Sequence, residues 1–244
     1  MPAPPRQRQQ TLNSESARLA DLSARLEALK ALQEKVKTDG KLRPWLAQHG
    51  LEGMAGLWSK LHIETGWENA LEAALRERLG ALEVGRLDMV RGFLGSGGTD
   101  APPAKLAFFS PPAAVQPAPA ARLPRLADLL RINDAGLSGV LNDWLTGCYT
   151  APTLDEALAK RDQLQAGEAI YIPGGHAVTA HSVGFYAQDS EQSGLLARAQ
   201  EIEHLDKELR AQALIAEESR TALVRAESAY ADAAQRLTGV RREA

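Results

Sequence analysis

The sequence predicts a mixed α/β domain inserted between two long helices that pair as a coiled coil. Only 5% of the residues are aromatic, and eleven of the twelve aromatic residues lie between Trp45 and Tyr186. Globular cores use aromatic side chains because each buries a large area, whereas a two-helix seam prefers Leu, Ile, Val and Ala in a regular repeat. Residues 1–40 and 188–244 carry such a repeat. We therefore expect two helical arms around a globular insert at 41–187.

The first arm, residues 1–40, keeps its apolar residues in one heptad frame. The spacings alternate between three and four residues, and Arg, Glu and Lys fill much of the remainder, which indicates a coiled-coil seam. The a and d positions are Leu12, Leu19, Leu22, Leu26, Leu29, Gln33 and Val36.

The second arm, residues 188–244, also keeps one frame and is longer. Its a positions are Ile202, Leu209, Ala216, Leu223, Tyr230 and Leu237, and its d positions are Leu205, Gln212, Ser219, Ala226, Ala233 and Val240. At 1.5 Å per residue the second helix spans about 80 Å and the first about 40 Å, so part of the second arm should lack a partner within the chain. Neither arm ends at a helix-stop signal, so the chain is expected to be a fragment of a longer coil.

The first part of the insert, residues 41–110, mixes strand and helix patterns. Thr65 and Glu68 have the spacing of a capping box before an apolar stripe that runs to Gly80, which predicts a helix. The other expected elements are a strand over 57–63, a short apolar run at 82–84, a helix over 87–94 and a strand over 105–109.

A proline-rich linker at 111–130 separates this part from a second one at 131–187. Seven of the thirteen prolines lie between Pro102 and Pro124, and such a stretch cannot form a continuous helix or a central strand. The second part is expected to hold a helix over 137–145, a strand at 148–149, a helix opened by the capping box Thr153–Glu156, and two strands, 169–173 and 177–186, joined through Gly174-Gly175 as a hairpin. The fold class is therefore an α/β insert of two similar subdomains between two coiled-coil helices.

Composition excludes several classes of protein. With 44% hydrophobic and 24% charged residues the chain is globular, and it contains neither an apolar run of about 18 residues nor a signal peptide, which predicts a cytoplasmic protein without a membrane span. The single Cys148 excludes an internal disulfide and an all-cysteine metal site. The net charge of -3 argues against a surface coated with nucleic-acid-binding groups but permits a local basic patch.

No catalytic constellation is found in the sequence. The glycine-rich run 92–98 follows a predicted helix rather than a strand and lacks the Lys-Ser/Thr of a phosphate-binding loop, and no Walker motif occurs. His176 and His181 are predicted on opposite faces of a strand without a carboxylate or cysteine cluster to complete a metal site. We expect no enzyme activity, no cofactor and no metal.

Four stretches resemble the hinge domain of SMC proteins, the chromosome-organising ATPases with antiparallel coiled-coil arms. Residues 53–58 (GMAGLW) and 67–75 (WENALEAAL) are similar to the first strand and the "E-x-A-L-E-A-A-L-G" helix of the family. Residues 154–158 (LDEAL) are similar to its second-half helix, and 186–192 (YAQDSEQ), passing into 195–198 (LLAR), to the exit of bacterial hinges. The resemblance covers about residues 42–210.

The resemblance implies a role in chromosome condensation and segregation. Family hinges join two SMC chains, each half of one hinge pairing with the opposite half of its partner by strand addition, and the hinge or its junction with the coil can contact DNA. It also implies a parent protein that is nucleoid-associated and that binds ATP and kleisin-type subunits through head domains outside this chain. Exposed strand edges in two half-sheets agree with homodimerisation, because an open edge is a template for another chain.

Seven residues are candidates for the dimer contact. They are Ala107, Phe108 and Phe109 in the first half and Ser182, Val183, Gly184 and Phe185 in the second. Many family hinges carry a glycine-rich run here, whereas 181–186 contains one glycine, which implies a bulkier contact. The alternative is that these residues face the core of their own chain.

Five cations near the junction of the first arm and the insert are candidates for DNA contact: Lys30, Lys35, Lys37, Lys41 and Arg43. They outnumber Glu34 and Asp39 there by 5 to 2, although the insert as a whole carries 13 basic and 15 acidic residues. Such a patch would bind DNA without reading its sequence, with a dissociation constant of about 10⁻⁴ to 10⁻⁶ M. The alternative is a solvated, lysine-rich helix end. For the whole chain, the alternative function is a coiled-coil scaffold whose insert binds protein rather than DNA.

Overall fold

A computed structural model describes residues 5–37, 42–93, 101–114, 120–187 and 194–243. The chain divides into two compact units. One contains the first 32 residues together with residues 201–244, and the other contains residues 33–200. The first unit is the coiled coil and the second is the α/β insert, so the predicted fold class is confirmed.

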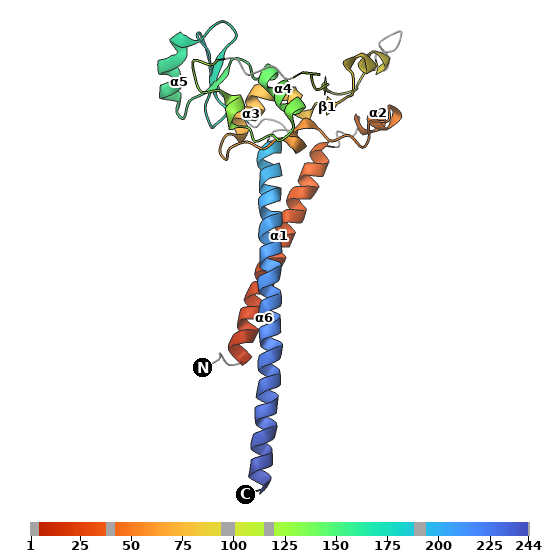
Figure 1. The fold of residues 1–244 in the computed structure, drawn as a ribbon, viewed down its shortest axis with the longest axis vertical. Coiled ribbons are helices and arrows are strands. Elements are labelled where there is room, and N and C mark those ends of the chain that lie inside the picture. The colour runs from red at the N-terminus through yellow and green to blue at the C-terminus, as the bar shows by residue number, and fades with distance from the viewer. Residues whose placement is uncertain (1–4, 38–41, 94–100, 115–119, 188–193, 244) are drawn as a thin grey trace. The chain divides into compact units, whose positions relative to one another are not determined.

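The coiled-coil unit contains most of helices α1 (Pro5–Lys37) and α6 (Leu195–Glu243), which lie side by side (Figure 1). The Arg8 guanidinium donates to the carbonyl of Ala222 over 2.8 Å, and Arg18 pairs with Glu208 at 3.2 Å. Because the residue number in α6 falls as the number in α1 rises, the two helices are antiparallel.

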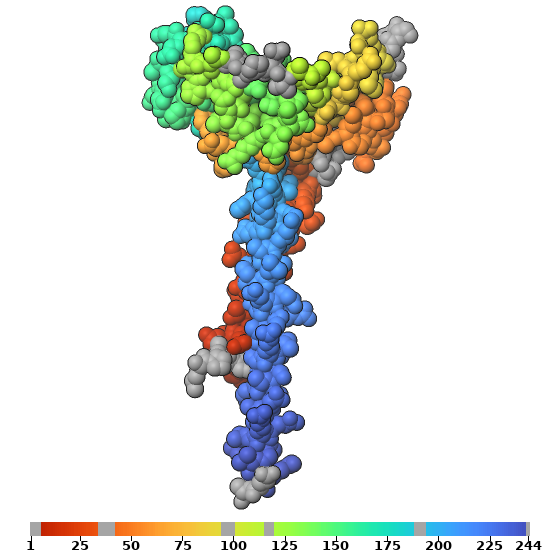
Figure 2. Space-filling view, viewed as in Figure 1, coloured from red at the N-terminus to blue at the C-terminus, as the bar shows by residue number. Residues whose placement is uncertain are grey.

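The seam of this coil follows the predicted heptads. Leu22, Leu26 and Leu205 are at most 4% exposed and form one apolar cluster. In α6 every predicted a and d residue from Ile202 to Ala226 is buried or half-buried, whereas Tyr230, Leu237 and Val240 are exposed. Figure 2 shows this last part of α6, in dark blue, without α1 beside it. The prediction that part of the second arm lacks a partner in this chain is confirmed for the described residues.

The larger core of the insert gathers around helix α3 (Glu68–Leu75). It is built from the 3₁₀ helices η1 (Leu57–Lys60), η2 (Arg76–Gly80) and η4 (Leu126–Leu129) and from α4 (Ala135–Trp144). Leu57, Leu71, Leu126 and Leu141 are at most 1% exposed in this core, which Leu196 of α6 also joins. Leu123 and Leu126 are buried, so the end of the proline-rich stretch packs into the insert. Beside it lies a two-stranded parallel sheet of β1 (Leu82–Glu83) and β2 (Phe108–Phe109).

A second core lies under a four-stranded sheet with the order β3-β4-β5-β6. Strands β3 (Cys148–Thr150) and β4 (Ala169–Tyr171) are parallel, while β5 (Ala177–Val178) and β6 (Val183–Gly184) continue the sheet in antiparallel fashion. Helix α5 (Leu154–Lys160) contributes Ala157, which is fully buried with Ile170 and Val178. The Thr153 hydroxyl accepts from the Glu156 amide, which confirms Thr153 as the N-cap of this helix, while the Glu156 carboxylate pairs with Lys160.

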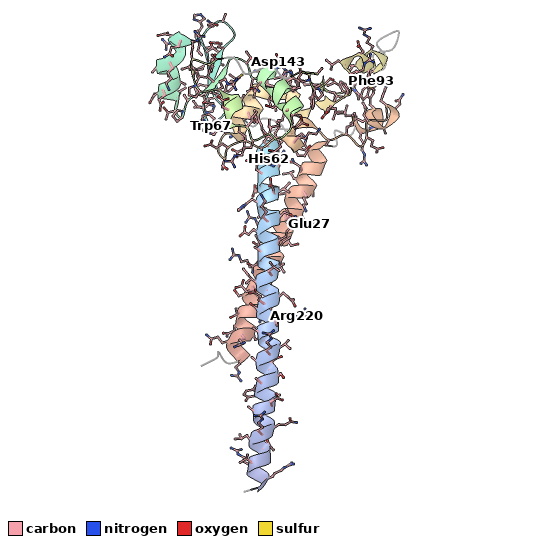
Figure 3. The ribbon with its side chains drawn as sticks, in the orientation of Figure 1. Glu27, His62, Trp67, Phe93, Asp143 and Arg220 are labelled. Carbon is pink, nitrogen blue, oxygen red and sulfur yellow. The ribbon has the colours of Figure 1, made fainter. Side chains whose placement is uncertain are left out.

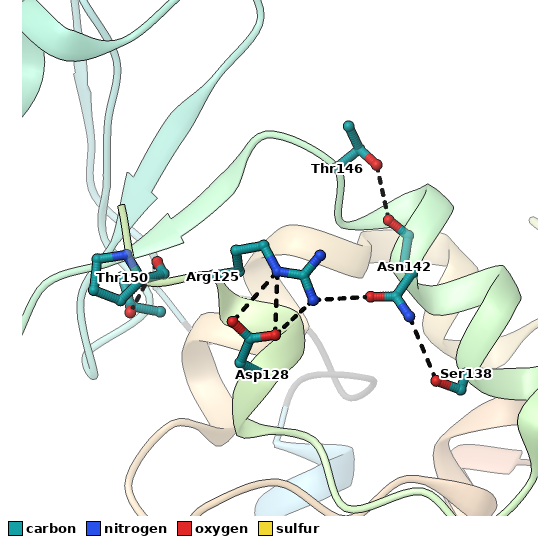
Figure 4. A network of polar contacts seen from close by, with 7 residues as sticks. Arg125, Asp128, Ser138, Asn142, Thr146 and Thr150 are labelled. Atoms are coloured by element: carbon teal, nitrogen blue, oxygen red, sulfur yellow. Dashed lines mark hydrogen bonds and ion pairs between the residues drawn. The ribbon is translucent and has the colours of Figure 1, made fainter. Parts of the chain in front are cut away.

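The outer side of β3 is covered by the segment before η4. The Thr150 amide donates to the Pro124 carbonyl over 2.8 Å, and Arg125 forms a bridge with Tyr149. Arg125 also pairs with Asp128 and donates to Asn142, which connects η4 to α4 (Figure 4). The hydrogen bond from Arg125 lowers the pKa of Asp128, so this ion pair is retained at neutral pH. A short 3₁₀ helix, η5 (Arg161–Gln163), follows α5.

Four sequence expectations are wrong in detail. Residues 57–60 form η1 instead of a strand, because the amide and hydroxyl of Ser59 both donate to the Gly56 carbonyl and close a tight turn. Residues 87–93 form a 3₁₀ helix, η3 (Leu87–Phe93), in place of an α-helix. Thr65 does not cap α3; Trp67 takes the N-cap position and the Glu68 carboxylate accepts from the Gly66 amide.

The fourth concerns 177–186, which is two strands instead of one. The Thr179 amide donates to the Ser182 carbonyl over 2.9 Å, and the Ser182 amide donates back to the Thr179 hydroxyl over 3.0 Å. These local bonds close a hairpin between β5 and β6. As a result, β6 becomes the outermost strand of the four-stranded sheet.

Candidate interaction surfaces

Strand β6 presents an open edge. Val183 pairs with Val178 and Gly184 with Ala177, and among the described residues no strand lies on the other side of β6. Since Thr179 and Ser182 form a hydrogen-bonded pair, the next pair, Val178 and Val183, is of the non-hydrogen-bonded type. The amide and carbonyl of Val183 therefore point away from β5, where they can pair with an added strand.

The side chains around this edge are exposed. Ser182 and Gly184 are exposed, Val183 is 38% exposed and Phe185 is 73% exposed. The ring of Phe185 lies edge-on to the His176 imidazole, with 5.2 Å between the ring centroids. All four second-half candidates thus lie together on one accessible surface, as an interaction edge requires.

A groove of about 1040 Å³ reaches the end of β6 within the insert. Its lining includes Arg76 and Glu77 of η2, Gly184 of β6 and the neighbouring Phe185. Lys105 also lines it. The lining of the groove therefore comes from both parts of the insert.

The three first-half candidates lie differently. Phe109 is 3% exposed and meets Trp144 edge-on at 5.9 Å in the larger core, so the alternative of a core-facing residue applies to its side chain. Phe108 is half-buried with its ring 5.4 Å from that of Phe93, which Figure 3 labels. The carbonyl of half-buried Ala107 accepts from the Leu82 amide over 2.9 Å. These residues hold β2 to its own chain.

Helix α2 (Leu42–Gln48) is attached through aromatic contacts. Trp45 stacks on His49 at 4.2 Å between ring centroids, and both rings meet Phe93 edge-on, at 5.4 and 5.2 Å. Of the cationic candidates, Arg43 is exposed on this helix and pairs with Glu52 at 3.8 Å. Lys30 is exposed in the coiled-coil unit. The side chains of Lys35 and Lys37, and all of Lys41, lie outside the described residues.

Two residues that the sequence did not single out have unusual environments. Glu72 is 5% exposed although it carries a carboxylate, and its sequence position did not distinguish it from the other charges on an amphipathic helix. Arg76 has φ 52° and ψ -130°, a backbone conformation that favours glycine, and it stands where the family motif quoted above has glycine. Both residues line the groove beside β6.

Within the described ranges, no group of three or more His, Cys, Asp or Glu side chains could hold a metal ion. Burial raises the pKa of the Cys148 thiol to about 11, so it is protonated at neutral pH. No described helix is both long enough and apolar enough to cross a bilayer. The exposed edge and the groove remain as the candidate functional surface.

Comparison with known proteins places the chain among the SMC proteins. Residues 51–161 match the family model of the SMC proteins flexible hinge domain. The chain is 78% identical over 240 residues to the chromosome partition protein Smc of Delftia acidovorans and 55% identical over 235 residues to that of Burkholderia pseudomallei, with 98% and 96% of this chain aligned. It spans 20% of the length of each of these two relatives.

The fold is also found in a solved structure. A crystal structure of an asymmetric dimer of the Geobacillus stearothermophilus SMC hinge domain matches with a TM-score of 0.65 over 92% of this chain and 98% of that one. The sequence identity is 16%, so the match concerns the fold.

Proposed function

This chain is the hinge domain, with its flanking coiled coil, of a bacterial SMC protein, and on that premise we propose that it joins two copies of itself along the β6 edge. The observation that carries the proposal is the outward-pointing amide and carbonyl of Val183 beside exposed Phe185. A hinge domain of the same fold crystallised as an asymmetric dimer, which supports dimerisation of this chain. The parent protein then acts in chromosome condensation and segregation, with ATP and kleisin-type subunits bound elsewhere along it.

In this proposal the added strand comes from the other copy and lies in the groove next to β6. Ser182, Val183, Gly184 and Phe185 form the contact on one copy. Phe108 contributes on the opposite copy through the backbone of β2. Ala107, whose carbonyl accepts from the Leu82 amide, and the buried Phe109 side chain hold β2 in place. Main-chain hydrogen bonds supply affinity, and the bulky Phe185 takes the place of the glycines that many hinges have here.

Sedimentation equilibrium of the 244-residue chain tests this proposal, with Val183→Pro as the decisive variant. Proline removes the outward amide and adds a ring at the open edge, while leaving the hydrogen bonds to β5 in place. We expect the association constant to fall about tenfold or more. Val183→Thr retains the amide and a similar shape, and should associate within about twofold of the original chain. A monomeric original chain, or equal association of both variants, contradicts the proposal.

Weak DNA contact at the junction of α1 and α2 is the second part of the proposed function. Lys30 and Arg43 are both exposed, and with Lys35, Lys37 and Lys41 they supply the local positive charge. Replacing Lys35, Lys37 and Lys41 by Glu should abolish retention of the chain on DNA at low salt, because phosphate neutralisation provides the binding energy. Replacement of Arg220, Arg225 and Arg236 of α6 by Glu is the control of equal charge change. Unchanged DNA retention in the first variant contradicts a patch at this place.

A further inference from the structure

We infer that Glu72 and Tyr186 form a joint through which the β6 edge and the first turn of α6 hold each other in place. The Glu72 carboxylate, 5% exposed, accepts three hydrogen bonds. Its Oε1 accepts from the Leu196 amide over 2.8 Å, and its Oε2 accepts from the Gly194 amide over 2.7 Å and from the Tyr186 hydroxyl over 2.9 Å. A buried carboxylate is costly unless it is neutralised, and here the amides at the start of a helix do so.

Tyr186 links this carboxylate to the sheet. It follows Phe185 directly, and its amide donates to Nδ1 of His176 over 3.0 Å, just before β5. The raised pKa of its phenol, due to burial and to the Glu72 charge, keeps the hydroxyl protonated as a donor. One residue therefore contacts the turn before β5 through its backbone and α3 through its side chain.

The turn before β5 is in close contact with both Tyr186 and helix α3. A Cβ on Gly175, which has φ +83°, would lie 2.7 Å from the Tyr186 ring and 2.8 Å from the Asn69 carbonyl of α3. Because these atoms are in close contact, Tyr186 cannot shift without moving either the turn or the Glu72 carboxylate. The β6 edge and the start of α6 are thereby connected through two side chains.

Other contacts hold the same turn of α6. Gln33, 4% exposed, donates from Nε2 to the Leu195 carbonyl over 3.3 Å and accepts at Oε1 from Arg198 over 3.1 Å. Gln200 donates to the Ile63 carbonyl over 3.0 Å. None of these three bonds reaches the sheet, whereas the bonds of Tyr186 and Glu72 connect it to the first turn of α6.

This joint has a consequence for the hinge that rests on the proposed function. A strand bound along β6 restrains Val183 and Phe185, and hence Tyr186, and this restraint favours the closed first turn of α6. By linkage, loosening that turn weakens binding at β6 by the same factor. The joint itself does not depend on what binds at β6, so a chain that failed to dimerise would leave it standing and refute only the proposed function.

Site-resolved amide hydrogen exchange on the 244-residue chain with Glu72→Gln tests the joint. A glutamine side chain has one acceptor oxygen in place of two, so its amino group must face an N–H or O–H donor. We expect exchange at Gly194, Leu196 and Tyr186 to rise about tenfold or more, with the core amide of Ile170 unchanged. The Tyr186 amide is the informative probe, since Glu72 does not contact it. Glu68→Gln, half-buried in the first turn of the same helix and without contact to Tyr186 or α6 in the bonds given above, is the matched control and should change none of these amides.

Tyr186→Phe is the milder second variant, because it removes one hydroxyl and keeps the backbone bond to His176. It should speed exchange at Gly194 and at Tyr186 several-fold. If the exchange rate of the amide at position 186 is unchanged in both variants, Glu72 only caps α6 and has no link to the sheet. An equal rise at Ile170 would show general destabilisation. Either result overturns the inference.

Discussion

The two edges of the four-stranded sheet differ in whether another segment of the chain covers them. At β3 the Thr150 amide donates to the Pro124 carbonyl, and Arg125, Asp128 and Asn142 secure the covering segment. At β6 no described segment covers the strand, and Val183 and Phe185 are exposed. Soluble proteins commonly protect such edges. The uncovered edge is therefore the one available for another chain, and its covered counterpart shows that this chain can cover an edge with its own residues.

The largest effect on stability is expected when the segment that covers the β3 edge loses its support in the core. Leu126 is fully buried in η4, which carries the covering segment. We expect Leu126→Ala to lower the free energy of unfolding by about 2–5 kcal/mol, because it leaves a cavity in the larger core. Urea denaturation of the chain measures this loss. Leu87→Ala, on a 3₁₀ helix but 57% exposed, should cost under about 0.5 kcal/mol. Similar losses in the two variants would contradict the assigned packing.

Truncating an exposed side chain beside the open edge should weaken association between copies and leave the stability of the single chain unchanged. Phe185→Ala removes a ring that is 73% exposed in the single chain. If a second copy buries this ring, association should weaken by about 1.5–3 kcal/mol, or roughly tenfold to a hundredfold. Sedimentation equilibrium provides the constants. Tyr230→Ala is the control, because this aromatic residue on α6 is 69% exposed and lies outside the insert. A normal dimer with Phe185→Ala argues against this surface.

The groove that Gly184 and Phe185 line also contains backbone strain that can be relieved. Arg76 at φ 52° and ψ -130° occupies a conformation that costs a residue with a side chain about 1–3 kcal/mol. We expect Arg76→Gly to stabilise the chain by about 1 kcal/mol. This is the relieved strain minus the cost of the greater conformational freedom that glycine gives the unfolded chain. Arg76→Ala also removes the guanidinium but retains the strain, so it should not stabilise. Thermal unfolding distinguishes these variants. Equal melting temperatures for Arg76→Gly and Arg76→Ala would contradict a strained backbone at Arg76.

The smallest effect concerns Cys148, on the covered edge strand. Burial raises the pKa of its thiol from 9.0 to about 11. The folded chain therefore holds this proton more tightly than the unfolded chain, and the stability that results is complete below about pH 9 and is lost as the pH rises toward 11. Alkylation rates measured against pH should show a midpoint near 11 in the folded chain and near 9 in urea. A folded midpoint near 9 would show that the Cys148 thiol is not buried against the larger core.

The coiled coil could be predicted from the sequence almost residue by residue. A heptad repeat states which side of a helix is buried, and each predicted a and d residue from Ile202 to Ala226 is indeed shielded. For the strands, the sequence predicted the position along the chain but not which side chains face the core. Apolar residues at 105–109 and at 182–185 look alike in sequence, yet Phe109 faces Trp144 in the core and Phe185 faces outward.

The remaining differences depend on contacts between distant residues. The hairpin at 179–182 arises from local Thr and Ser bonds that an alternating pattern does not reveal. Glu72 looked like one more charge on an amphipathic helix, because its partners lie more than a hundred residues later in the chain. The resemblance to SMC hinges identified the fold but not these bonds, which only the folded backbone brings together.

Amide hydrogen exchange at Val183, measured at increasing concentrations of the 244-residue chain, tests the central claim most directly. Its N–H points to the open edge, so it should exchange rapidly in dilute monomer and become protected as the dimer forms. The Val178 amide, on β5 beside it, should be unaffected by concentration. Protection of Val183 that rises with the dimer fraction is the predicted result. Rapid exchange at Val183 in a fully formed dimer would contradict pairing along β6.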